Sequence, residues 1–254
     1  MNNPRVSVYD QISWVGRSGF DFIDFSIEPP VATPENIDVK KVKMLMKKYN
    51  IGIVGHIGDW RLPKDSDYES VRKASLNEII KAVRIHAKLG AKKITIHAPG
   101  ADDRVIDATI GRYCQLIGAL LKEAKKLGVS IMVENGDTND KQNQLMLIDH
   151  LLKRFPKLGL HIDVGHSNIG VKKNMVHYYM KKYSKRIMHL HFSDNKGGHD
   201  DHKELGWGNI KWKEIISLLK RYGYDGTITV ETFRSGPAGT VRSMNRLKKW
   251  WAMY

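Results

Sequence analysis

The chain has 254 residues, one cysteine and a formal net charge of +15. This length is close to the roughly 250 residues of one (β/α)8 barrel, and a single cysteine excludes an internal disulfide. No apolar run reaches the roughly 18 residues that a membrane helix needs, and the first residues lack the pattern of a secretory signal. We therefore expect a cytoplasmic protein with no membrane partner.

The positive charge has two interpretations. A nucleic-acid or polyphosphate partner would use it directly. Alternatively, the lysines and arginines form a solvated surface on outer helices, as in KKVKMLMKK at 40–48 and KKYSKR at 181–186. We favour the second interpretation, because net charge alone says little about fold or chemistry.

Short runs rich in Val, Ile and Phe alternate along the chain with longer stretches of helical spacing. One helix is predicted over 34–49, and the apolar residues between 110 and 124 recur at spacings of three and four, which is typical of an amphipathic helix. Several helices are expected to end at a glycine just before the next strand. The predicted strands are Arg5–Tyr9, Asp21–Ile27, Gly52–His56, Lys93–His97, Val129–Glu134, Gly159–Asp163, Ile187–Phe192 and Thr227–Glu231.

Strands that alternate with helices pair in parallel through right-handed crossovers. Eight such units in about 250 residues favour a closed barrel over an open sheet. No GxGxxG follows the first predicted strand, so a dinucleotide-binding fold has little support. The predicted fold class is α/β, a single (β/α)8 TIM barrel that forms one domain over residues 1–254.

Six successive predicted strands carry a histidine or an acidic residue at or near their carboxyl ends. All carboxyl ends of a parallel barrel open on one face, where catalytic residues gather, and imidazole and carboxylate groups are ligands for divalent metals. Any one of them alone could be a hydrogen-bonded histidine or a helix cap, so the prediction rests on the set. The strand-end residues are His56, His97, Glu134, Asp163, His191 and Glu231, and the following loops add His166, Asp200 and His202.

His161 and His189 each lie two residues before a candidate ligand on the same strand. Side chains two apart on a strand point to the same face. We therefore expect both rings one layer deeper than the ligands, where they would support them or fill the core.

The order of several fragments identifies a family resemblance. GHIGDW, LGAKKITIHAPG, VENG, HIDVGH, HLHFSDN, DDHKELGWGNI and TVET occur in this sequence from residue 55 to residue 232. The chain resembles the xylose isomerase-like TIM-barrel superfamily, which contains ketose 3-epimerases and other sugar phosphate isomerases and also endonuclease IV, of AP endonuclease family 2. The resemblance covers nearly the whole chain and is much less specific for one reaction.

The resemblance implies a metal site. Sugar-converting members hold one divalent metal with a Glu, an Asp, a His and a Glu from their last four strands. In endonuclease IV the same positions and several others hold three zinc ions. The expected cofactor is therefore Mn, Zn, Mg or Co, one ion in an isomerase and up to three zinc ions in an endonuclease. The residues matching the four common ligands are Glu134, Asp163, His191 and Glu231, and those matching the additional positions are His56, His97, His166, Asp200 and His202.

For an isomerase or epimerase, the substrate would be a small keto sugar, sugar phosphate or hydroxy-keto acid. The metal would stabilise an enediolate while a carboxylate moves the proton. We expect Glu134 and Glu231 to be the acid and base. The residues expected to bind substrate are His166, Lys196, Trp60 and Trp207.

Two alternatives remain open from the sequence. An endonuclease IV-like AP endonuclease would explain the nine matching ligands and the basic charge, although the chain is short for it and its basic loop residues are scattered. A dehydratase, a lyase or an inactive metal-binding barrel would carry the same residues. The helix with Trp250 and Trp251 could form a homo-oligomer interface or pack against its own barrel.

Overall fold

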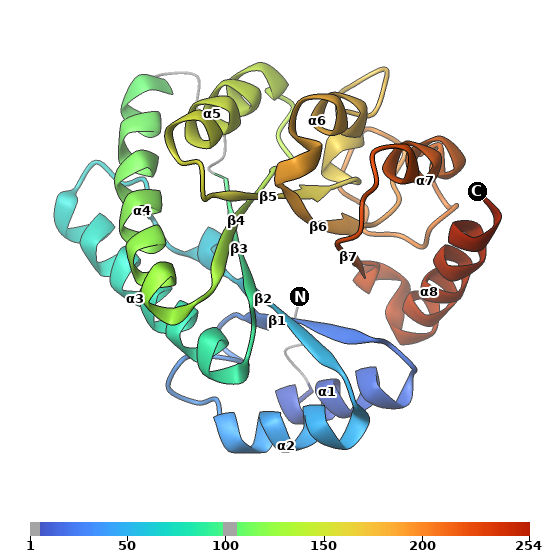
Figure 1. Ribbon diagram of the computed structural model, residues 1–254, viewed down its shortest axis with the longest axis horizontal. Helices are drawn as coiled ribbons and strands as arrows, with labels where there is room; N and C mark the ends of the chain where they lie inside the picture. Colours follow the sequence, from blue (N-terminus) through green and yellow to red (C-terminus); the bar gives the residue numbers. More distant parts are fainter. Residues whose placement is uncertain (1–5, 99–105) are drawn as a thin grey trace. The chain divides into compact units, whose positions relative to one another are not determined.

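The computed structural model describes residues 6–98 and 106–254. They form two compact units. Figure 1 labels the helices and strands of the chain. The first comprises the chain up to Val133 together with Met146–Leu158, and the second comprises Glu134–Leu145 and Gly159–Tyr254. That residues 1–254 form one domain stays a prediction.

In the first unit, helices alternate with strands that pair in parallel with the next strand along the chain, β1 with β2 and β2 with β3. The buried side chains include Phe25 on β1, Val54 on β2, and Ile94 and Ile96 on β3. The elements are α1 (Val8–Arg17), β1 (Phe22–Ile27), α2 (Val39–Tyr49), β2 (Gly52–Ile57), η1 (Asp59–Arg61), α3 (Glu69–Leu89), β3 (Lys93–His97) and α4 (Ile106–Leu127).

The second unit repeats this alternation, and β5, β6 and β7 pair in parallel in that order. Two of the three boundaries between the units fall within an element: one before Glu134 in β4 and one after Leu145 in α5. The third precedes Gly159, the first residue of β5. The elements are β4 (Ser130–Glu134), α5 (Lys141–Arg154), β5 (Gly159–Asp163), η2 (His166–Asn168), α6 (Val176–Tyr183), η3 (Ser184–Arg186), β6 (Ile187–Phe192), α7 (Trp212–Arg221), β7 (Thr227–Val230), η4 (Phe233–Ser235) and α8 (Gly236–Met253).

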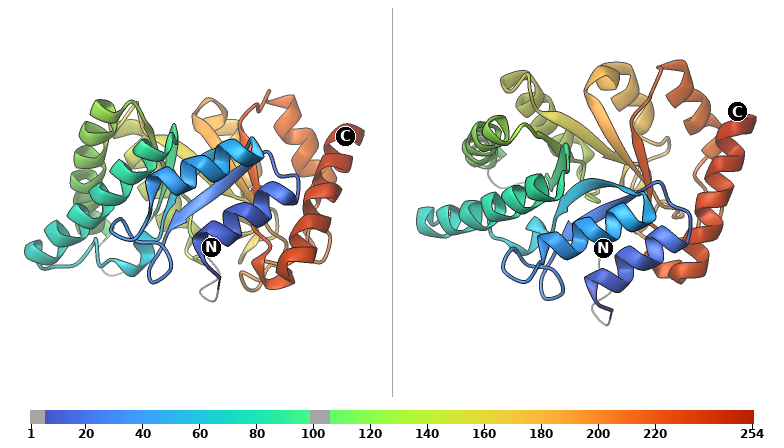
Figure 2. Two further views of the ribbon diagram at one scale, coloured as in Figure 1. Left: turned by 90° about the horizontal axis from the view of Figure 1, so that it is seen from below. Right: turned by 60° about the horizontal axis from the view of Figure 1, so that its bottom comes forward.

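The predicted first strand, Arg5–Tyr9, is wrong over residues 6–9, and Arg5 lies outside the described residues. Val8 begins helix α1, because the Ser7 side chain accepts a hydrogen bond from the Asp10 backbone N–H and caps the helix. Val8 and Ile12 are buried one turn apart. A short Val-Ser-Val-Tyr run alternates like a strand, but the cap and the helical period that follows determine the structure. Figure 2 shows α1 beside α2, which it contacts.

The other seven predicted strands are confirmed, three of them residue for residue: Lys93–His97, Gly159–Asp163 and Ile187–Phe192. The predicted glycine stops are also present. Gly90 ends α3 with a φ of 100°, a left-handed conformation that side chains with a Cβ rarely adopt. The predicted helix over 34–49 begins later, at Val39, where the Asp38 side chain caps it.

Register determines which side chains share the end of the sheet in the second unit. Asp163 at the end of β5 lies opposite His191 on β6, and His161 lies opposite His189. Beneath this end, Phe192 packs against Trp212 on α7, whose ring stacks on Trp250 of α8. Trp250 thus packs against its own unit, as one of the two interpretations expected. No helix in the described part of the chain is both long and apolar enough to cross a bilayer.

Candidate metal centre and active site

Four side chains from four successive strands converge in the second unit. Nδ1 of His191 lies 3.1 Å from Oε2 of Glu231, 3.5 Å from Oε1 of Glu134 and 3.8 Å from Oδ2 of Asp163. Glu134 and Asp163 are the last residues of β4 and β5, and Glu231 directly follows β7. The structure therefore brings together the four residues predicted to hold a metal.

This centre has an excess of negative charge in a buried place. The side chains of Glu134, Asp163 and His191 are at most 1% exposed, and that of Glu231 is 14% exposed. Burial, with the charges of Asp200 and Glu231, raises the pKa of Asp163. Burial would also raise the pKa of Glu231, but His191 and His202 outweigh it and hold that pKa well below its usual value.

The donor set fits a divalent cation. Oδ2 of Asp163 is buried and makes no hydrogen bond within the described residues, and a buried carboxylate oxygen is costly unless it is paired or metal-bound. Carboxylate oxygens with one imidazole nitrogen suit Mn, Mg, Zn or Co. Glu134, Asp163, His191 and Glu231 would hold the ion.

A second group adjoins these four. One carboxylate oxygen of Asp200 accepts hydrogen bonds from both His166, at 3.2 Å, and His202. Nδ1 of His202 also lies 3.5 Å from Oε2 of Glu231. Burial lowers the pKa of both imidazoles, but the surrounding carboxylates outweigh it and raise both pKa values. These three side chains are close enough together to share a cation.

Asn135 and Lys141 were not predicted, yet both fix this site. Asn135 accepts a hydrogen bond from the Asp163 backbone N–H at 2.8 Å and donates to the Asp163 carbonyl, and its own carbonyl faces Nδ1 of His166 at 2.8 Å. Lys141 donates to the His166 carbonyl, and burial lowers its pKa to about 8. Asn135 directly follows Glu134, so its position beside a predicted ligand was the available signal.

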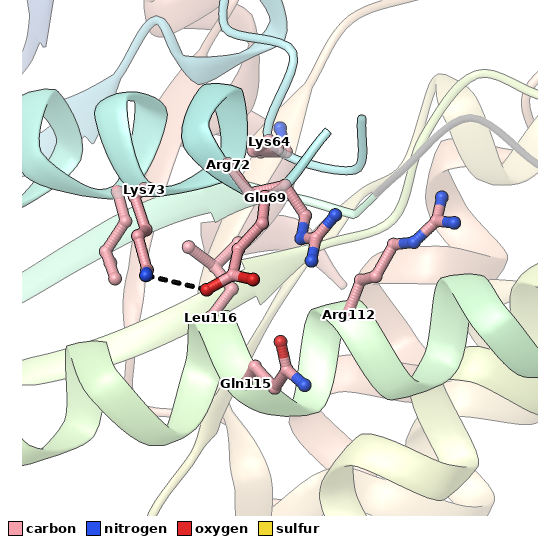
Figure 3. A pocket seen from close by; sticks show the side chains of 8 residues that line it. Lys64, Glu69, Arg72, Lys73, Arg112, Gln115 and Leu116 are labelled. Carbon is pink, nitrogen blue, oxygen red and sulfur yellow. Dashed lines mark ion pairs between the residues drawn. The ribbon is translucent and has the colours of Figure 1, made fainter. Parts of the chain in front are cut away.

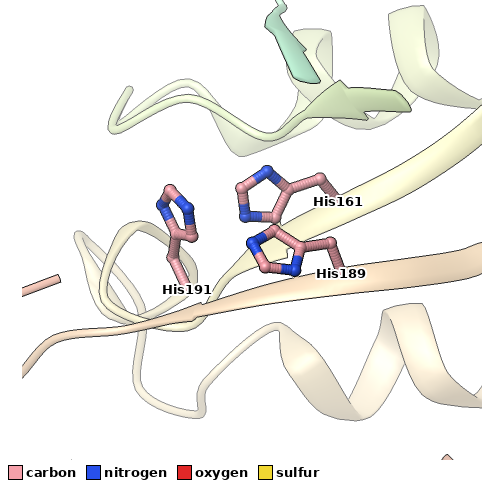
Figure 4. Close-up of side chains that lie close together, drawn as sticks. All are labelled: His161, His189 and His191. Carbon is pink, nitrogen blue, oxygen red and sulfur yellow. The ribbon is translucent and has the colours of Figure 1, made fainter. Parts of the chain in front are cut away.

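Two further imidazoles, those of His161 and His189, lie beside the His191 ring (Figure 4). Nδ1 of His161 is 3.4 Å from Oε2 of Glu134, and the His161 and His191 rings are 4.1 Å apart. His189 contacts the hydroxyls of Thr227 at 2.6 Å and Thr229 at 3.2 Å, one with each ring nitrogen. Both nitrogens of His189 are therefore engaged, which favours a supporting role, and His161 is placed to orient Glu134.

His56 and His97, two of the residues predicted as additional metal ligands, lie together in the first unit. Their Nε2 atoms are 3.2 Å apart, and Nδ1 of His97 lies 2.6 Å from Oδ1 of Asp59. Asp59 is fully buried and pairs with Lys64 at 2.5 Å. Burial would raise the pKa of Asp59, but Lys64 and His97 hold it far below its usual value. Asp59 was not predicted, because it becomes distinctive only through contacts with residues distant in sequence.

The residues predicted to bind substrate are divided between the units. In the second unit, the Lys196 ammonium lies 4.6 Å from the centroid of the Trp207 ring, and Trp207 is 44% exposed. In the first unit, the Trp60 ring meets His97 edge-on at 4.7 Å and is 42% exposed. An exposed indole beside a histidine or a lysine can cover the apolar face of a sugar.

Comparison with known proteins supplies the family context. The family model described as the xylose isomerase-like TIM barrel matches residues 12–250. A ketose 3-epimerase of Arthrobacter globiformis is 23% identical over 230 residues, 86% of this chain and 75% of that protein.

Solved structures confirm the predicted fold. A D-tagatose 3-epimerase-like protein superimposes with a TM-score of 0.85 at 24% identity, over 97% of this chain and 94% of that one. The IOLI protein, in a structure with a bound zinc atom, superimposes with a TM-score of 0.79 at 14% identity, over 98% of this chain and 94% of that one. The fold class is that of the TIM barrel.

Proposed function

Because the chain belongs to the xylose isomerase-like TIM-barrel family, we propose that it is a divalent-metal-dependent epimerase or isomerase of a small keto sugar. The observation that carries this proposal is the convergence of Glu134, Asp163 and Glu231 on one ring nitrogen of His191. The similarity to a ketose 3-epimerase and to a D-tagatose 3-epimerase-like protein supports proton transfer at the carbon beside a ketose carbonyl.

A divalent ion, when bound by these residues, would supply Lewis-acid stabilisation of negative charge on the substrate oxygens. The protein must then remove and return one proton. Glu134 and Glu231 approach the centre from different strands, β4 and the end of β7, so each could face one side of a bound sugar. We assign one as the base and the other as the acid, with the roles exchanged in the reverse direction.

His161 would fix the orientation of Glu134 in this reaction. It contacts Oε2 of that carboxylate, and Oε1 faces His191. His166, held by Asn135 and Asp200, would hold a substrate hydroxyl. Lys196 and Trp207 would bind the outer part of the sugar, one through charge and the other through its ring face.

The epimerase is preferred over the endonuclease IV-like and lyase alternatives because the named relatives are sugar epimerases. A phosphate on the substrate, a homo-oligomeric state and a cytoplasmic location stay predictions. The metal is proposed as Mn, Zn, Mg or Co, one ion per chain, held by the four convergent residues.

The proposal is tested with protein purified without chelator. Metal content is measured first, and one divalent ion per chain is expected. The protein is then incubated in deuterium oxide with a panel of ketoses, including fructose, tagatose and allulose, and products are followed by NMR. Epimer formation with deuterium at the exchanged carbon supports the proposal. Absence of exchange on every ketose, together with incision of abasic duplex DNA and three zinc ions per chain, would overturn it.

A further inference from the structure

A pocket of about 340 Å³ lies in the first unit between the start of α3 and helix α4 (Figure 3). Its polar lining includes Lys64, Arg72, Lys73 and Arg112, with Glu69 as the acidic member. All these residues belong to the first unit, and none of them is among the four convergent ligands of the second. We propose that this pocket binds the phosphate group of a small phosphorylated molecule.

The two arginines are held in place by backbone contacts. Nη1 of Arg72 donates to the carbonyls of Ser66 at 2.7 Å and Asp67 at 2.9 Å. Nη1 of Arg112 donates to the carbonyl of Asp65 at 2.7 Å, and its Nη2 pairs with the Asp67 carboxylate. A guanidinium has five N–H donors, so each arginine retains donors for a ligand. Arginines fixed in this way lose less entropy when they bind an anion.

The charge balance of the lining singles out Arg72. Lys64 pairs with buried Asp59, Lys73 with Glu69 and Arg112 with Asp67. The hydrogen-bond partners of Arg72 within the described residues are neutral carbonyls. The charge of Arg72 also acts on the Glu69 carboxylate. A bound anion could still approach Arg72 without breaking one of the three salt bridges above.

An incoming anion could replace the carboxylate partners in two of these ion pairs, Lys73 with Glu69 and Arg112 with Asp67. The side chains of Lys73 and Glu69 are 72% and 67% exposed, and that of Asp67 is 84% exposed. Exposed ion pairs contribute little stability, so a phosphate could replace Glu69 at Lys73 and Asp67 at Arg112. Two arginine forks and one ammonium would then face the phosphate oxygens, an arrangement that suits bidentate binding.

The amino-terminal end of α3 also favours binding of an anion in this pocket. This helix has 21 residues, and Tyr68 at its N-cap provides no side-chain hydrogen bond to the first turn. The first backbone N–H groups of a helix have no partner within the helix, and together with the positive end of the helix dipole they favour an anion there. Glu69, in the first turn, lines the pocket.

The pocket's size and apolar side indicate more than a free phosphate ion. Its volume of about 340 Å³ lies at the lower end of small-molecule sites. Leu76 and Leu116 add apolar lining that could contact a carbon skeleton. Inorganic phosphate is therefore the minimal probe, and a phosphorylated hexose is expected to bind more tightly.

The test measures binding of inorganic phosphate and of fructose 6-phosphate by calorimetry on the metal-loaded, 254-residue chain. Fructose is titrated separately, so that any heat from sugar binding at the metal centre can be subtracted. Arg72→Gln is expected to weaken phosphate binding by about tenfold, the effect of one charge-assisted hydrogen bond. Lys73→Gln should weaken it less, because Lys73 is highly exposed. Tighter binding of fructose 6-phosphate than of phosphate identifies the phosphorylated molecule as the ligand, and equal binding identifies free phosphate.

Lys81→Gln is the matched control. Lys81 lies on the same helix and pairs with Glu78 at 2.8 Å, but it does not line the pocket. Unchanged binding in this variant and in His191→Ala would place the ligand in the pocket rather than on the general basic surface or at the metal centre. Equal losses in Lys81→Gln and Arg72→Gln, or loss in His191→Ala alone, would overturn the proposal. If Arg72→Gln does not fold, Arg72→Lys keeps the charge and removes the fork, and wild-type affinity in that variant and in Lys73→Gln would also overturn it.

Discussion

The buried carboxylates of the two units have different charged partners. In the first, the Asp59 carboxylate pairs with the Lys64 ammonium, and His97 shares the same carboxylate. In the second, the ion pairs of Asp163 and Glu231 within the described residues are with histidines, which are charged only when protonated. The first cluster therefore carries its own counter-charge, and the second depends on protons or on an added cation.

Because of this difference, histidines that follow the same sequence pattern have different surroundings in the two units. His56 and His97 follow the same strand-end pattern as the ligands of the second unit. Their partners form a buried chain of contacts through Asp59 to Lys64, which supplies a positive charge. Around His191 the described ion pairs of the three carboxylates are with histidines, and Oδ2 of Asp163 makes no hydrogen bond in the described structure. A carboxylate-rich centre of this kind is the better candidate for metal-assisted chemistry. A metal-binding role of His56 and His97 stays a prediction.

The largest expected effect is on turnover. Glu134→Gln and Glu231→Gln keep the shape of each side chain but remove its ability to take a proton, so kcat should fall by about 10²–10⁴. Deuterium exchange into the ketose measures the loss. Each variant should keep the wild-type circular dichroism spectrum, because glutamine fills the same volume. Wild-type exchange rates in either variant would contradict the acid–base assignment.

The second largest expected effect is a loss in the free energy of unfolding when a lysine of the first unit is replaced. Lys64→Met leaves Asp59 buried without its cation and should cost about 3–5 kcal/mol in the free energy of unfolding. Urea denaturation measures it. Lys73→Met removes an equivalent lysine from an exposed pair with Glu69 and should cost less than about 1 kcal/mol. Adding Asp59→Asn to Lys64→Met should recover part of the loss, and equal losses in the two single variants would refute the distinction.

A third test uses pH. His86 is fully buried, its Nε2 faces the His56 carbonyl at 3.1 Å, and burial lowers its pKa from 6.5 to about 4. The unfolded chain therefore binds a proton more readily than the folded chain between these pH values. Stability contributed by neutral His86 is present above pH 6.5 and is lost as the pH falls to about 4.

His86→Gln isolates this contribution, since an amide can keep the hydrogen bond to His56 but does not titrate. Between pH 7 and pH 4 the wild-type chain should lose about 3 kcal/mol more than this variant, from a shift of about two and a half pKa units. Urea unfolding at both pH values measures the difference. Parallel losses in the two proteins would show that His86 is already protonated in the fold or is not buried in solution.

Much of the fold and of the candidate site could be predicted, because both depend on patterns within short segments of the sequence. A buried parallel strand is an apolar run of about five residues, and the residue at its end is readily identified. Glu134, Asp163, His191 and Glu231 were each found in this way. Their roles as metal ligands and as acid and base stay predictions.

What could not be predicted depends on contacts between distant residues or on competing local signals. Asp59 is set apart by His97, 38 positions away, and nothing in the turn after β2 signals that contact. The segment after Arg5 has strand-like alternation, but a serine cap makes it helical. The phosphate pocket likewise requires α3 and α4 to be side by side, since Arg72 and Arg112 are far apart in the sequence.

The smallest expected effect is on substrate affinity in the second unit. Lys196→Met keeps the length of the side chain but removes the charge above Trp207, so KM for a ketose should rise about tenfold, as expected for one charge-assisted hydrogen bond, with kcat nearly unchanged. Lys203→Met is the matched control, because Lys203 lies over the same ring at 5.8 Å and has no predicted role in binding. Equal rises in the two variants would mean that the ring's surroundings, rather than a contact from Lys196, set the affinity. A fall in kcat with unchanged KM would instead move Lys196 from substrate binding to the chemical step.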